Sequence, residues 1–363
     1  MHLRIAQLAP PFESVPPTGY GGTERVVSTL TEELVRRGHD VTLFASGDSR
    51  TSARLTPLVD TALWHLDPPS NDFTPHQSAI FGKILDRIDE FDLVHSHLDY
   101  RGFPLALATQ TPMLSTLHGR LDVPNLVEIY RAFADLPLVS ISDAQRRPLA
   151  TANWQGTVYH GIDLDQFTFN PEPGRYLAFL GRISPEKGLD VAIRVARRAG
   201  VPLLIAARPP LPFDHSPEVW RDRAYFEQVV EPLLSGPGVE LIGQVGGAEK
   251  DEFLRDAAAL LFPIRWPEPF GLVMAEALAC GTPVLALSEG SVPEVIDPGV
   301  TGFVCHLEDE LVRAVERIPE LDRWRCRAEA ERRFSPGAMA EAYETVYAGL
   351  LAGARVPAPA VYA

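Results

Sequence analysis

Short apolar runs alternate with amphipathic helical patterns along most of the chain, and this alternation limits the fold more than any other feature of the sequence. The first run spans residues 3–9, a turn-rich loop follows, a helical pattern begins at Thr23, and a second run spans 41–45. Continuous apolar runs suit strands that are buried on both faces. Strands that alternate with helices predict a parallel sheet with helices on both of its faces.

The alternation is interrupted once, by the proline-rich segment at 167–175, and it restarts with the apolar run at 176–182. A chain of 363 residues has room for two domains that each bury a core. We therefore predict an α/β protein of two Rossmann-like, doubly wound domains that face a cleft. The predicted domains are residues 1–166 and 167–334, and a final helix with a loose tail occupies 335–363.

The charge balance argues against large anionic partners. The sequence has 33 basic and 48 acidic side chains, a net charge of −15. Nucleic acids and anionic membranes need an extended basic face, so we predict no nucleic-acid binding and at most weak membrane association. Only three of the basic residues are lysines, namely Lys83, Lys187 and Lys250. In a chain that otherwise uses arginine, each lysine marks a position to examine.

The cysteines and the N-terminal segment indicate the compartment. Cys280, Cys305 and Cys326 form no C-x-x-C pair, so neither a disulfide framework nor a zinc knuckle is predicted. The opening apolar stretch ends at Pro10-Pro11 and is too short for a signal peptide, and no apolar run is long enough to span a membrane. We expect a cytoplasmic protein.

The most specific motif is EPFGLVMAE at 268–276, which follows the buried-strand pattern ALLFPI. We predict that a helix begins at Pro269, so that the free N–H groups of residues 270–273 point at an anion. Glu276 would lie about 80° around the helix from Glu268 and two turns deeper. Carboxylates so placed suit two hydroxyl-bearing groups of one long ligand, although two solvated glutamates on a helix fit the spacing equally well.

A second motif, GRISPEKG at 181–188, places two cations between the first strand and first helix of the second domain. Arg182 leaves the strand, and Lys187 enters the helix with Gly188. Their charge and position predict a diphosphate site opposite the start of the helix described above. An ordinary turn with solvated charges is the alternative.

The loop GYGGTE at 19–24 precedes the first helix. Gly21 and Gly22 let backbone amides approach a ligand closely. The loop does not match G-x-G-x-x-G, because Glu24 stands where the third glycine belongs, so a nicotinamide dinucleotide site is disfavoured.

Four histidines follow predicted strands. His118 stands between a strand and a glycine, and we expect it to be functional, whereas a lone histidine elsewhere is more often structural. His95 and His97 resemble a metal pair, but alternate residues of a strand point to opposite faces, so no metal site is predicted there. His160 lies just before the D-x-D sequence at 163–165, which is also not expected to bind a metal.

Together these motifs resemble the retaining glycosyltransferases of family 4, which have the GT-B fold. The resemblance rests on GYGGTE, TLHG, VSISDAQR, HGID, GRISPEKG and above all EPFGLVMAEALACGTPVLA, which contains the glutamate–seven–glutamate motif of that family. It implies transfer of a hexose from a nucleotide sugar to a hydroxyl acceptor, a saccharide or a glycolipid, by a front-face mechanism without metal or cofactor. It also implies that the helix in 335–363 crosses back to the N-terminal domain.

The resemblance further implies a role for each site residue. Glu268 would hold hydroxyls of the donor sugar, Glu276 would hold the ribose hydroxyls, and His118 would contact the sugar near the reaction centre. The implied catalytic residues are His118, Arg182, Lys187 and Glu268. The implied donor-binding residues are Gly21, Gly22, Arg182, Lys187, Glu268, Phe270, Gly271, Leu272, Val273 and Glu276.

Several points stay open at the level of sequence. UDP-glucose is the predicted donor, with GDP-mannose and ADP-glucose as alternatives, because the segment 207–225 with Arg208 departs from the glycine-rich turn of many relatives. An inverting transferase or an epimerase-like enzyme of the same fold is the alternative enzyme. A nucleotide-sugar-binding regulatory protein is the alternative without catalysis. The acceptor, the linkage and the oligomeric state are not predicted.

Overall fold

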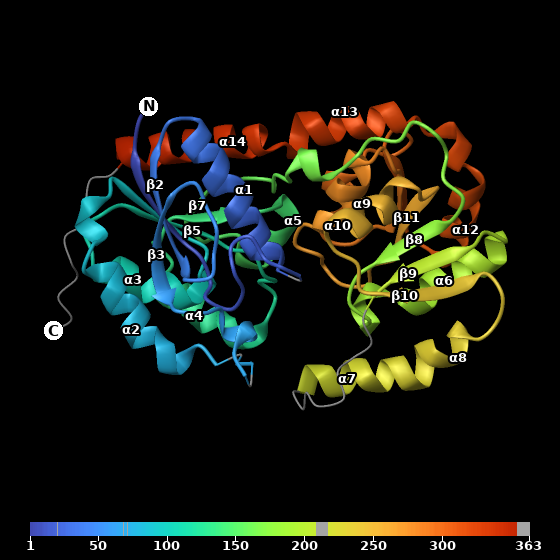
Figure 1. The fold of residues 1–363 in the computed structure, drawn as a ribbon, viewed down its shortest axis with the longest axis horizontal. Helices are drawn as coiled ribbons and strands as arrows, with labels where there is room; N and C mark the ends of the chain where they lie inside the picture. The colour runs from blue at the N-terminus through green and yellow to red at the C-terminus, as the bar shows by residue number, and fades with distance from the viewer. Residues whose placement is uncertain (20, 68, 71, 208–216, 354–363) are drawn as a thin grey trace. The chain divides into compact units, whose positions relative to one another are not determined.

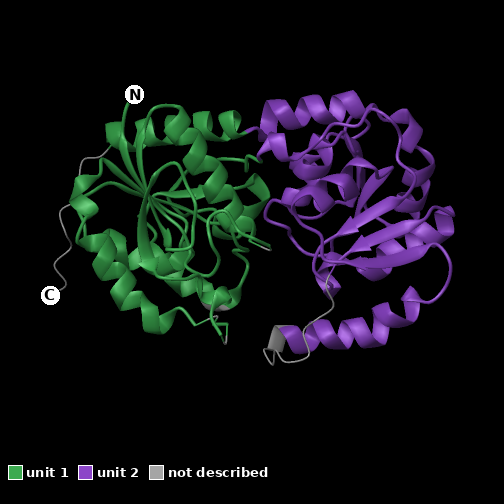
Figure 2. Cartoon of the chain, in the orientation of Figure 1, with its two compact units in different colours: residues 1–162, 336–363 green, residues 163–335 purple. Residues whose placement is uncertain are grey.

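The structure is a computed structural model of the chain. It divides into two compact units, of which unit 1 joins residues 1–162 to the last helix and unit 2 spans Asp163–Ser335 (Figure 2). The division follows Ile162, four residues before the end of the predicted first domain. The predicted tail and Arg208 lie outside the described residues. The structure describes residues 1–19, 21–67, 69–70, 72–207 and 217–353.

Unit 1 is built on a seven-stranded parallel sheet in the order β3-β2-β1-β4-β5-β6-β7 (Figure 1). Its strands are β1 (Arg4–Leu8), β2 (Asp40–Ser46), β3 (Arg54–Val59), β4 (Leu93–Ser96), β5 (Met113–Thr116), β6 (Leu138–Ser140) and β7 (Trp154–Thr157). Its helices are α1 (Gly22–Arg36), α2 (Thr74–Leu85), α3 (Phe103–Leu107), α4 (Val127–Ala132), α5 (Asp143–Arg146) and α14 (Pro336–Gly353). Strand β1 is buried at four of its five positions, as a parallel strand covered on both faces should be.

The last helix, α14, packs on unit 1 beside α1. Its buried side chains include Tyr343 and Tyr347, whose rings stack with centroids 6.0 Å apart. The hydroxyl of Tyr343 lies 2.9 Å from Oγ1 of Thr116 on β5, and that of Tyr347 lies 2.8 Å from Nδ1 of His95 on β4. One face of the helix therefore completes the core of unit 1.

Unit 2 is built on a six-stranded parallel sheet in the order β10-β9-β8-β11-β12-β13. Its strands are β8 (Leu177–Leu180), β9 (Leu203–Ala206), β10 (Val239–Gly243), β11 (Ala259–Phe262), β12 (Val284–Leu287) and β13 (Gly302–Cys305). Its helices are α6 (Leu189–Ala199), α7 (Pro217–Tyr225), α8 (Glu231–Leu234), α9 (Gly247–Arg255), α10 (Leu272–Ala279), α11 (Val292–Val295), α12 (Glu308–Glu316) and α13 (Arg323–Phe334). Two doubly wound, Rossmann-like units confirm the predicted fold class.

In each sheet the strand order reverses beside the strand that comes first in the chain. The reversal lies between β1 and β4 in unit 1 and between β8 and β11 in unit 2. Connections leave these neighbouring strands in opposite directions, and the crevice at their carboxyl ends is where open parallel sheets bind ligands. The residues that follow β1, β4, β8 and β11 are therefore the first place to look for a site.

Two further expectations concern membranes and cysteines. Among the helices that the structure describes, none combines the length and the apolar character needed to cross a membrane. Cys280, Cys305 and Cys326 are all free thiols, and each is buried.

Candidate functional site

The loops that follow β8 and β11 meet through a partly buried ion pair between Lys187 and Glu268. Nζ of Lys187 lies 2.5 Å from Oε2 of Glu268, and Nε1 of Trp266 donates to the same oxygen at 2.9 Å. The Lys187 ammonium also lies 5.3 Å from the centroid of the Trp266 ring. Glu268 is only 9% exposed. Its carboxylate is thus held in one orientation by two donors at the strand reversal of unit 2.

Two glycines permit this close approach. Gly188 has φ +70°, and a Cβ there would lie 2.1 Å from the carbonyl oxygen of Pro263, just after β11. Gly290 has φ +55°, and a Cβ there would lie 2.3 Å from the backbone of Glu268. The N–H of Ser291 donates to the carbonyl of Glu268 at 2.9 Å. Backbone contacts therefore fix Glu268 and Lys187 independently of their side chains.

The helix after Glu268 begins later than the sequence predicts. Helix α10 starts at Leu272, with Gly271 in the left-handed region at φ +76°, so the prediction that it starts at Pro269 is wrong. Phe270 turns into the core, where its ring meets that of Phe334 edge-on with centroids 5.7 Å apart. The left-handed Gly271 separates the proline-containing turn from the helix. Glu268 consequently stands before the helix, and the predicted angle between it and Glu276 does not apply.

The first turn of α10 offers free backbone donors. The N–H groups of Leu272 and Val273 have no intrahelical acceptor, because they open the helix, and no other described residue accepts from them. Two of the four predicted amides thus belong to a helix start, where the partial positive charge favours an anion.

The second glutamate of the motif has a partner that the sequence analysis did not assign. Oε1 of Glu276 lies 2.6 Å from Nζ of Lys250 on α9, and the two side chains are 6% and 11% exposed. The Lys250 ammonium also lies 5.1 Å from the ring centroid of Phe167. Two of the chain's three lysines therefore pair with the two motif glutamates. The scarcity of lysine was the signal that pointed to Lys250.

Neither Lys83, the third lysine, nor Arg182 pairs with a glutamate of the EPFGLVMAE motif. Lys83, on α2, donates to the backbone carbonyls of Pro57 and Leu58 in unit 1. Arg182 follows β8, and its half-exposed guanidinium pairs with Glu186 at 2.6 Å and with Asp222 at 3.3 Å. Arg182 and Lys187 thus engage different carboxylates in this structure, although both stand at the predicted junction.

In unit 1 the histidines at the ends of β4 and β5 lie in contact. The ring centroids of His95 and His97 are 4.1 Å apart, so the prediction that they point to opposite faces is wrong. His97 stands just beyond the end of β4, where strand alternation no longer applies. Nδ1 of His97 lies 2.8 Å from Nε2 of His118, whose ring stacks on that of His160 with centroids 5.1 Å apart.

These four rings are neutral at physiological pH. Burial lowers the pKa of His95 and of His118 to about 3, and it lowers the pKa values of His97 and His160 well below the ordinary range. Among the described residues, no group of three or more His, Cys, Asp or Glu side chains is arranged to hold a metal ion. The imidazoles can therefore exchange hydrogen bonds but carry no charge to a ligand.

The two remaining motifs are the loop GYGGTE at 19–24, which leads into α1, and the D-x-D sequence at 163–165. Gly21 is the N-cap of α1 and Gly22 its first residue, whereas the sequence favoured a start at Thr23. Burial raises the pKa of Glu24 to about 7, and the neighbouring Glu13 adds to the rise. In the D-x-D sequence, the carboxylate of Asp163 accepts hydrogen bonds from its own following turn.

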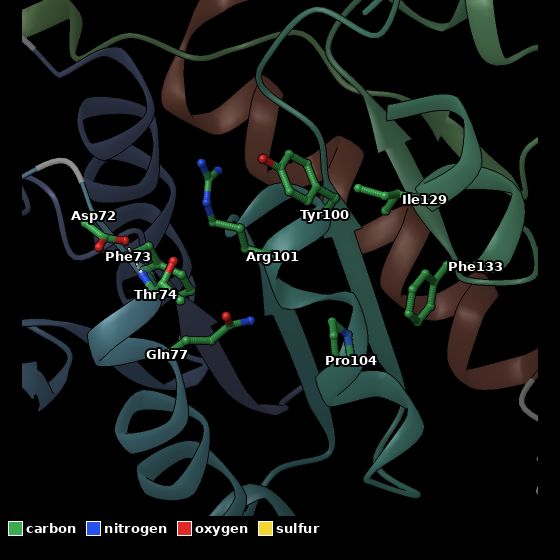
Figure 3. Close-up of a pocket in the computed structure, with 9 residues that line it drawn as sticks. All are labelled: Asp72, Phe73, Thr74, Gln77, Tyr100, Arg101, Pro104, Ile129 and Phe133. Carbon is green, nitrogen blue, oxygen red and sulfur yellow. Dashed lines mark hydrogen bonds between the residues drawn. The ribbon is translucent and has the colours of Figure 1, made fainter. Parts of the chain in front are cut away.

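A cavity of about 480 Å³ opens at the carboxyl edge of the unit 1 sheet (Figure 3). Arg101, which follows β4, lies 5.0 Å from the ring centroid of Tyr100 and 5.9 Å from that of Phe12, and no carboxylate in the described ranges forms an ion pair with it. Figure 3 shows the polar residues at the start of α2 on one side of Arg101, and residues of α4 on the other. The first side comprises Asp72, just before α2, with Thr74 and Gln77 of α2, and the other side comprises Ile129 of α4 and the adjoining Phe133.

Comparison with known proteins gives matches over nearly all of the chain. The profile described as Glycosyltransferase Family 4 matches residues 20–166, and that described as Glycosyl transferases group 1 matches residues 163–337. The D-inositol 3-phosphate glycosyltransferase of Streptomyces avermitilis is 28% identical over 363 residues, covering 80% of this chain and 73% of its own. The glycogen synthase of Mycobacterium tuberculosis is 25% identical over 405 residues and covers 95% of both chains.

Solved structures agree on the fold. The Anabaena protein Alr3699/HepE, in complex with UDP-glucose, superposes with a TM-score of 0.69 over 96% of this chain and 100% of its own, at 17% identity.

We predict that acid destabilises the protein through the histidine cluster. Well above pH 6.5 these rings are neutral in both the folded and the unfolded chain, so they contribute no pH dependence to the free energy of unfolding. Below pH 6.5 the unfolded chain takes up protons that the folded cluster refuses, so the free energy of unfolding should fall, by at most roughly 1.4 kcal/mol per pH unit for each ring. Urea unfolding at pH 7.5 and 5.5 measures this slope.

Glu24 acts in the opposite direction, since its raised pKa favours the folded state as pH falls from about 7. Four rings outweigh one carboxyl, so the net slope keeps its sign. The variant His160→Gln should flatten the slope by about one proton. Equal or greater stability at pH 5.5 would contradict the neutral cluster.

Proposed function

Because the chain belongs to glycosyltransferase family 4, we propose that it moves a hexose from a UDP-glucose-like donor to a hydroxyl of a saccharide or glycolipid, with retention at the anomeric carbon. The observation that carries the proposal is the pairing of both motif glutamates with lysines at the strand reversal of unit 2. We propose unit 2 as the donor-binding domain and unit 1 as the acceptor-binding domain. We propose that the reaction takes place in the cytoplasm, as predicted from the sequence.

The donor fits the charges of this site. When the sugar leaves, negative charge grows on the diphosphate, and fixed cations and oriented amides stabilise it. Lys187 and the N–H groups of Leu272 and Val273 supply that stabilisation, and Arg182 adds to it by exchanging Glu186 for phosphate. Protein groups thus do the work for which other transferases use a metal, and we propose a metal-independent reaction.

The carboxylates fit the hydroxyls of the donor. A buried carboxylate accepts strong hydrogen bonds from hydroxyl groups. Glu268, held by Lys187 and Trp266, binds the sugar, and Glu276, held by Lys250, binds the ribose. In the front-face mechanism the departing diphosphate oxygen takes the proton of the acceptor hydroxyl, so no carboxylate nucleophile is required.

We favour UDP-glucose as the donor because a protein of the same fold has been crystallised with it. The relatives do not fix the acceptor, since their names specify different products. The cavity beside Arg101 supports a saccharide. Planar polar groups pair well with vicinal hydroxyls, and the rings of Tyr100 and Phe133 offer apolar faces to a sugar.

The lysine pairings give a prediction about catalysis. Lys187→Ala should lower kcat/KM by about 30- to 1000-fold, a loss of roughly 2–4 kcal/mol, because it removes a fixed cation from the developing charge. Arg182→Ala should fall in the same range. Lys250→Ala should raise KM for the donor more than it lowers kcat, because it releases Glu276 from the ribose. Steady-state kinetics with varied donor separates these effects.

Lys83→Ala is the matched control, because it removes the remaining lysine from the other unit. Its kcat/KM should stay near that of the unaltered protein. Unfolding curves must accompany the assays, since removing one partner of a buried ion pair destabilises a protein by about 3–5 kcal/mol. Near-normal turnover in both the Lys187 and Arg182 variants would contradict the diphosphate site.

The proposed donor is tested by thermal shift and by product analysis. A nucleotide sugar at about 100 times its dissociation constant should stabilise the protein by roughly 2.7 kcal/mol. UDP-glucose should give the largest shift in a panel with GDP-mannose and ADP-glucose, and NAD⁺ should give none. NMR of the product should show the anomeric configuration of the donor, and EDTA should leave the rate unchanged. An inverted product would point to the inverting enzyme, and binding without turnover to a regulatory protein.

The acceptor cavity gives a prediction in unit 1. Arg101→Ala should raise KM for a saccharide acceptor about tenfold, the effect of losing roughly 1.4 kcal/mol of hydrogen bonding. The KM for the donor should not change. Arg120→Ala is the matched control, because this exposed arginine pairs with Asp122 outside the cavity. An unchanged acceptor KM in the Arg101 variant would place the acceptor elsewhere.

A further inference from the structure

A continuous chain of hydrogen bonds joins the last helix to His118 through Gln7. Gln7 lies on β1, and its amide oxygen is 2.8 Å from Nε2 of His97. The other nitrogen of His97 is 2.8 Å from Nε2 of His118. On its other side, the amide nitrogen of Gln7 faces the hydroxyl of Tyr347 at 3.5 Å. All four residues belong to unit 1, and they meet at the reversal between β1 and β4.

The orientation of the Gln7 amide fixes the direction of every bond in this chain. A carbonyl oxygen only accepts, so Nε2 of His97 carries a proton. A neutral imidazole has one donor and one acceptor, so Nδ1 of His97 is an acceptor, and Nε2 of His118 must donate to it. His118 is thereby left with a lone pair on Nδ1.

The bonds around Tyr347 agree with this direction. The amide nitrogen of Gln7 donates to the Tyr347 hydroxyl, which in turn donates a hydrogen bond to Nδ1 of His95 at 2.8 Å. Nε2 of His95 then donates to Oγ1 of Thr116 at 2.8 Å. Each donor finds an acceptor, and each buried ring has a defined tautomer.

The reversed amide is disfavoured by its consequence at His118. If Gln7 were turned over, every bond would reverse and His118 would carry its proton on Nδ1. That nitrogen is buried and has no hydrogen-bond partner among the described residues. A buried N–H without an acceptor costs about 1–3 kcal/mol. Leaving a lone pair of a buried nitrogen without a donor costs less free energy than leaving a buried N–H without an acceptor.

We propose that Gln7, whose amide is hydrogen-bonded to Tyr347, is a positioning residue: its amide oxygen accepts from His97 and so holds His118, the residue assigned to the donor sugar, as the tautomer protonated on Nε2. The proposal rests on the proposed function only in assigning the ligand, because the tautomer itself is a property of unit 1. The last helix, which contributes Tyr347, thereby acts on the site as well as on stability.

The tautomer is read directly by NMR on the full chain labelled with ¹⁵N-histidine. Long-range ¹H–¹⁵N correlations distinguish a protonated from an unprotonated ring nitrogen, and the variant His118→Gln assigns the signals. The unaltered protein should show His118 protonated on Nε2 alone. Gln7→Leu, which removes the fixed acceptor, should populate both tautomers and lower kcat/KM about tenfold, equivalent to roughly 1.4 kcal/mol.

Two further variants test the mechanism against a merely structural effect. Gln7→Glu presents only acceptor oxygens, so it should keep the His118 tautomer and rescue most of the activity lost in Gln7→Leu. Tyr347→Phe should let the amide turn over and give a mixture of tautomers. Thr345→Val is the matched control, because it removes a hydroxyl from the same helix that bonds to the backbone carbonyl of Glu341, outside this chain of hydrogen bonds. It should change neither the His118 signals nor kcat/KM.

Different outcomes would overturn the inferred His118 tautomer and the proposed transferase function. A proton on Nδ1 of His118 in the unaltered protein would overturn the inference, and so would a Gln7→Leu variant with unchanged tautomer and kcat/KM. Should Gln7→Leu fail to fold, Gln7→Glu and Tyr347→Phe carry the test by the same two measurements. Absence of transfer from any nucleotide sugar by the unaltered protein would instead defeat the proposed function, and the NMR result would still decide the tautomer.

Discussion

The ion pair between Lys187 and Glu268 is the interaction on which unit 2 depends for its site. A carboxylate as buried as that of Glu268 is tolerated only when it is paired and hydrogen-bonded, and its partner is the partly buried Lys187, so the loops after β8 and β11 must lie in contact. That contact is compatible only with glycine at 188 and 290, where any side chain would strike the facing backbone. The strand order places the two loops side by side, the backbone contacts at these glycines set the distance between them, and the ion pair orients the carboxylate of Glu268.

In unit 1 the side chains at the strand reversal are held in place by neutral groups and not by ion pairs. At its own strand reversal, buried polar side chains of β1, β4 and β5 form a neutral network, since burial lowers the pKa values of its histidines far below physiological pH. Ion pairs orient carboxylates in unit 2, whereas an amide and a tyrosine orient imidazoles in unit 1. Both units have a doubly wound parallel sheet, but ion pairs orient the side chains in unit 2 and neutral hydrogen bonds orient them in unit 1.

The sequence predicted best what depends on local pattern. The parallel strands, the two domains and the placement of Glu268 and Glu276 after buried strands followed from apolar periodicity and motif spacing. The start of α10 could not be predicted, because it depends on Gly271 adopting a left-handed conformation after two prolines. The contact of His95 with His97 was missed because β4 ends one residue earlier than the pattern implied. The partner of Glu276 lies on another helix, a tertiary contact that spacing cannot show.

The charges of the site explain how an acidic chain can take an anionic ligand. The two lysines and two glutamates sum to zero, so the site does not attract polyanions from a distance, in keeping with the net charge of −15. A diphosphate alone would have to displace a buried carboxylate from its lysine, which is unfavourable. A ligand that brings hydroxyls together with phosphates gives each glutamate new donors as its lysine turns to phosphate. The paired arrangement therefore supports the proposed nucleotide-sugar donor over free phosphate or nucleic acid, because such a ligand offers partners to all four groups at once.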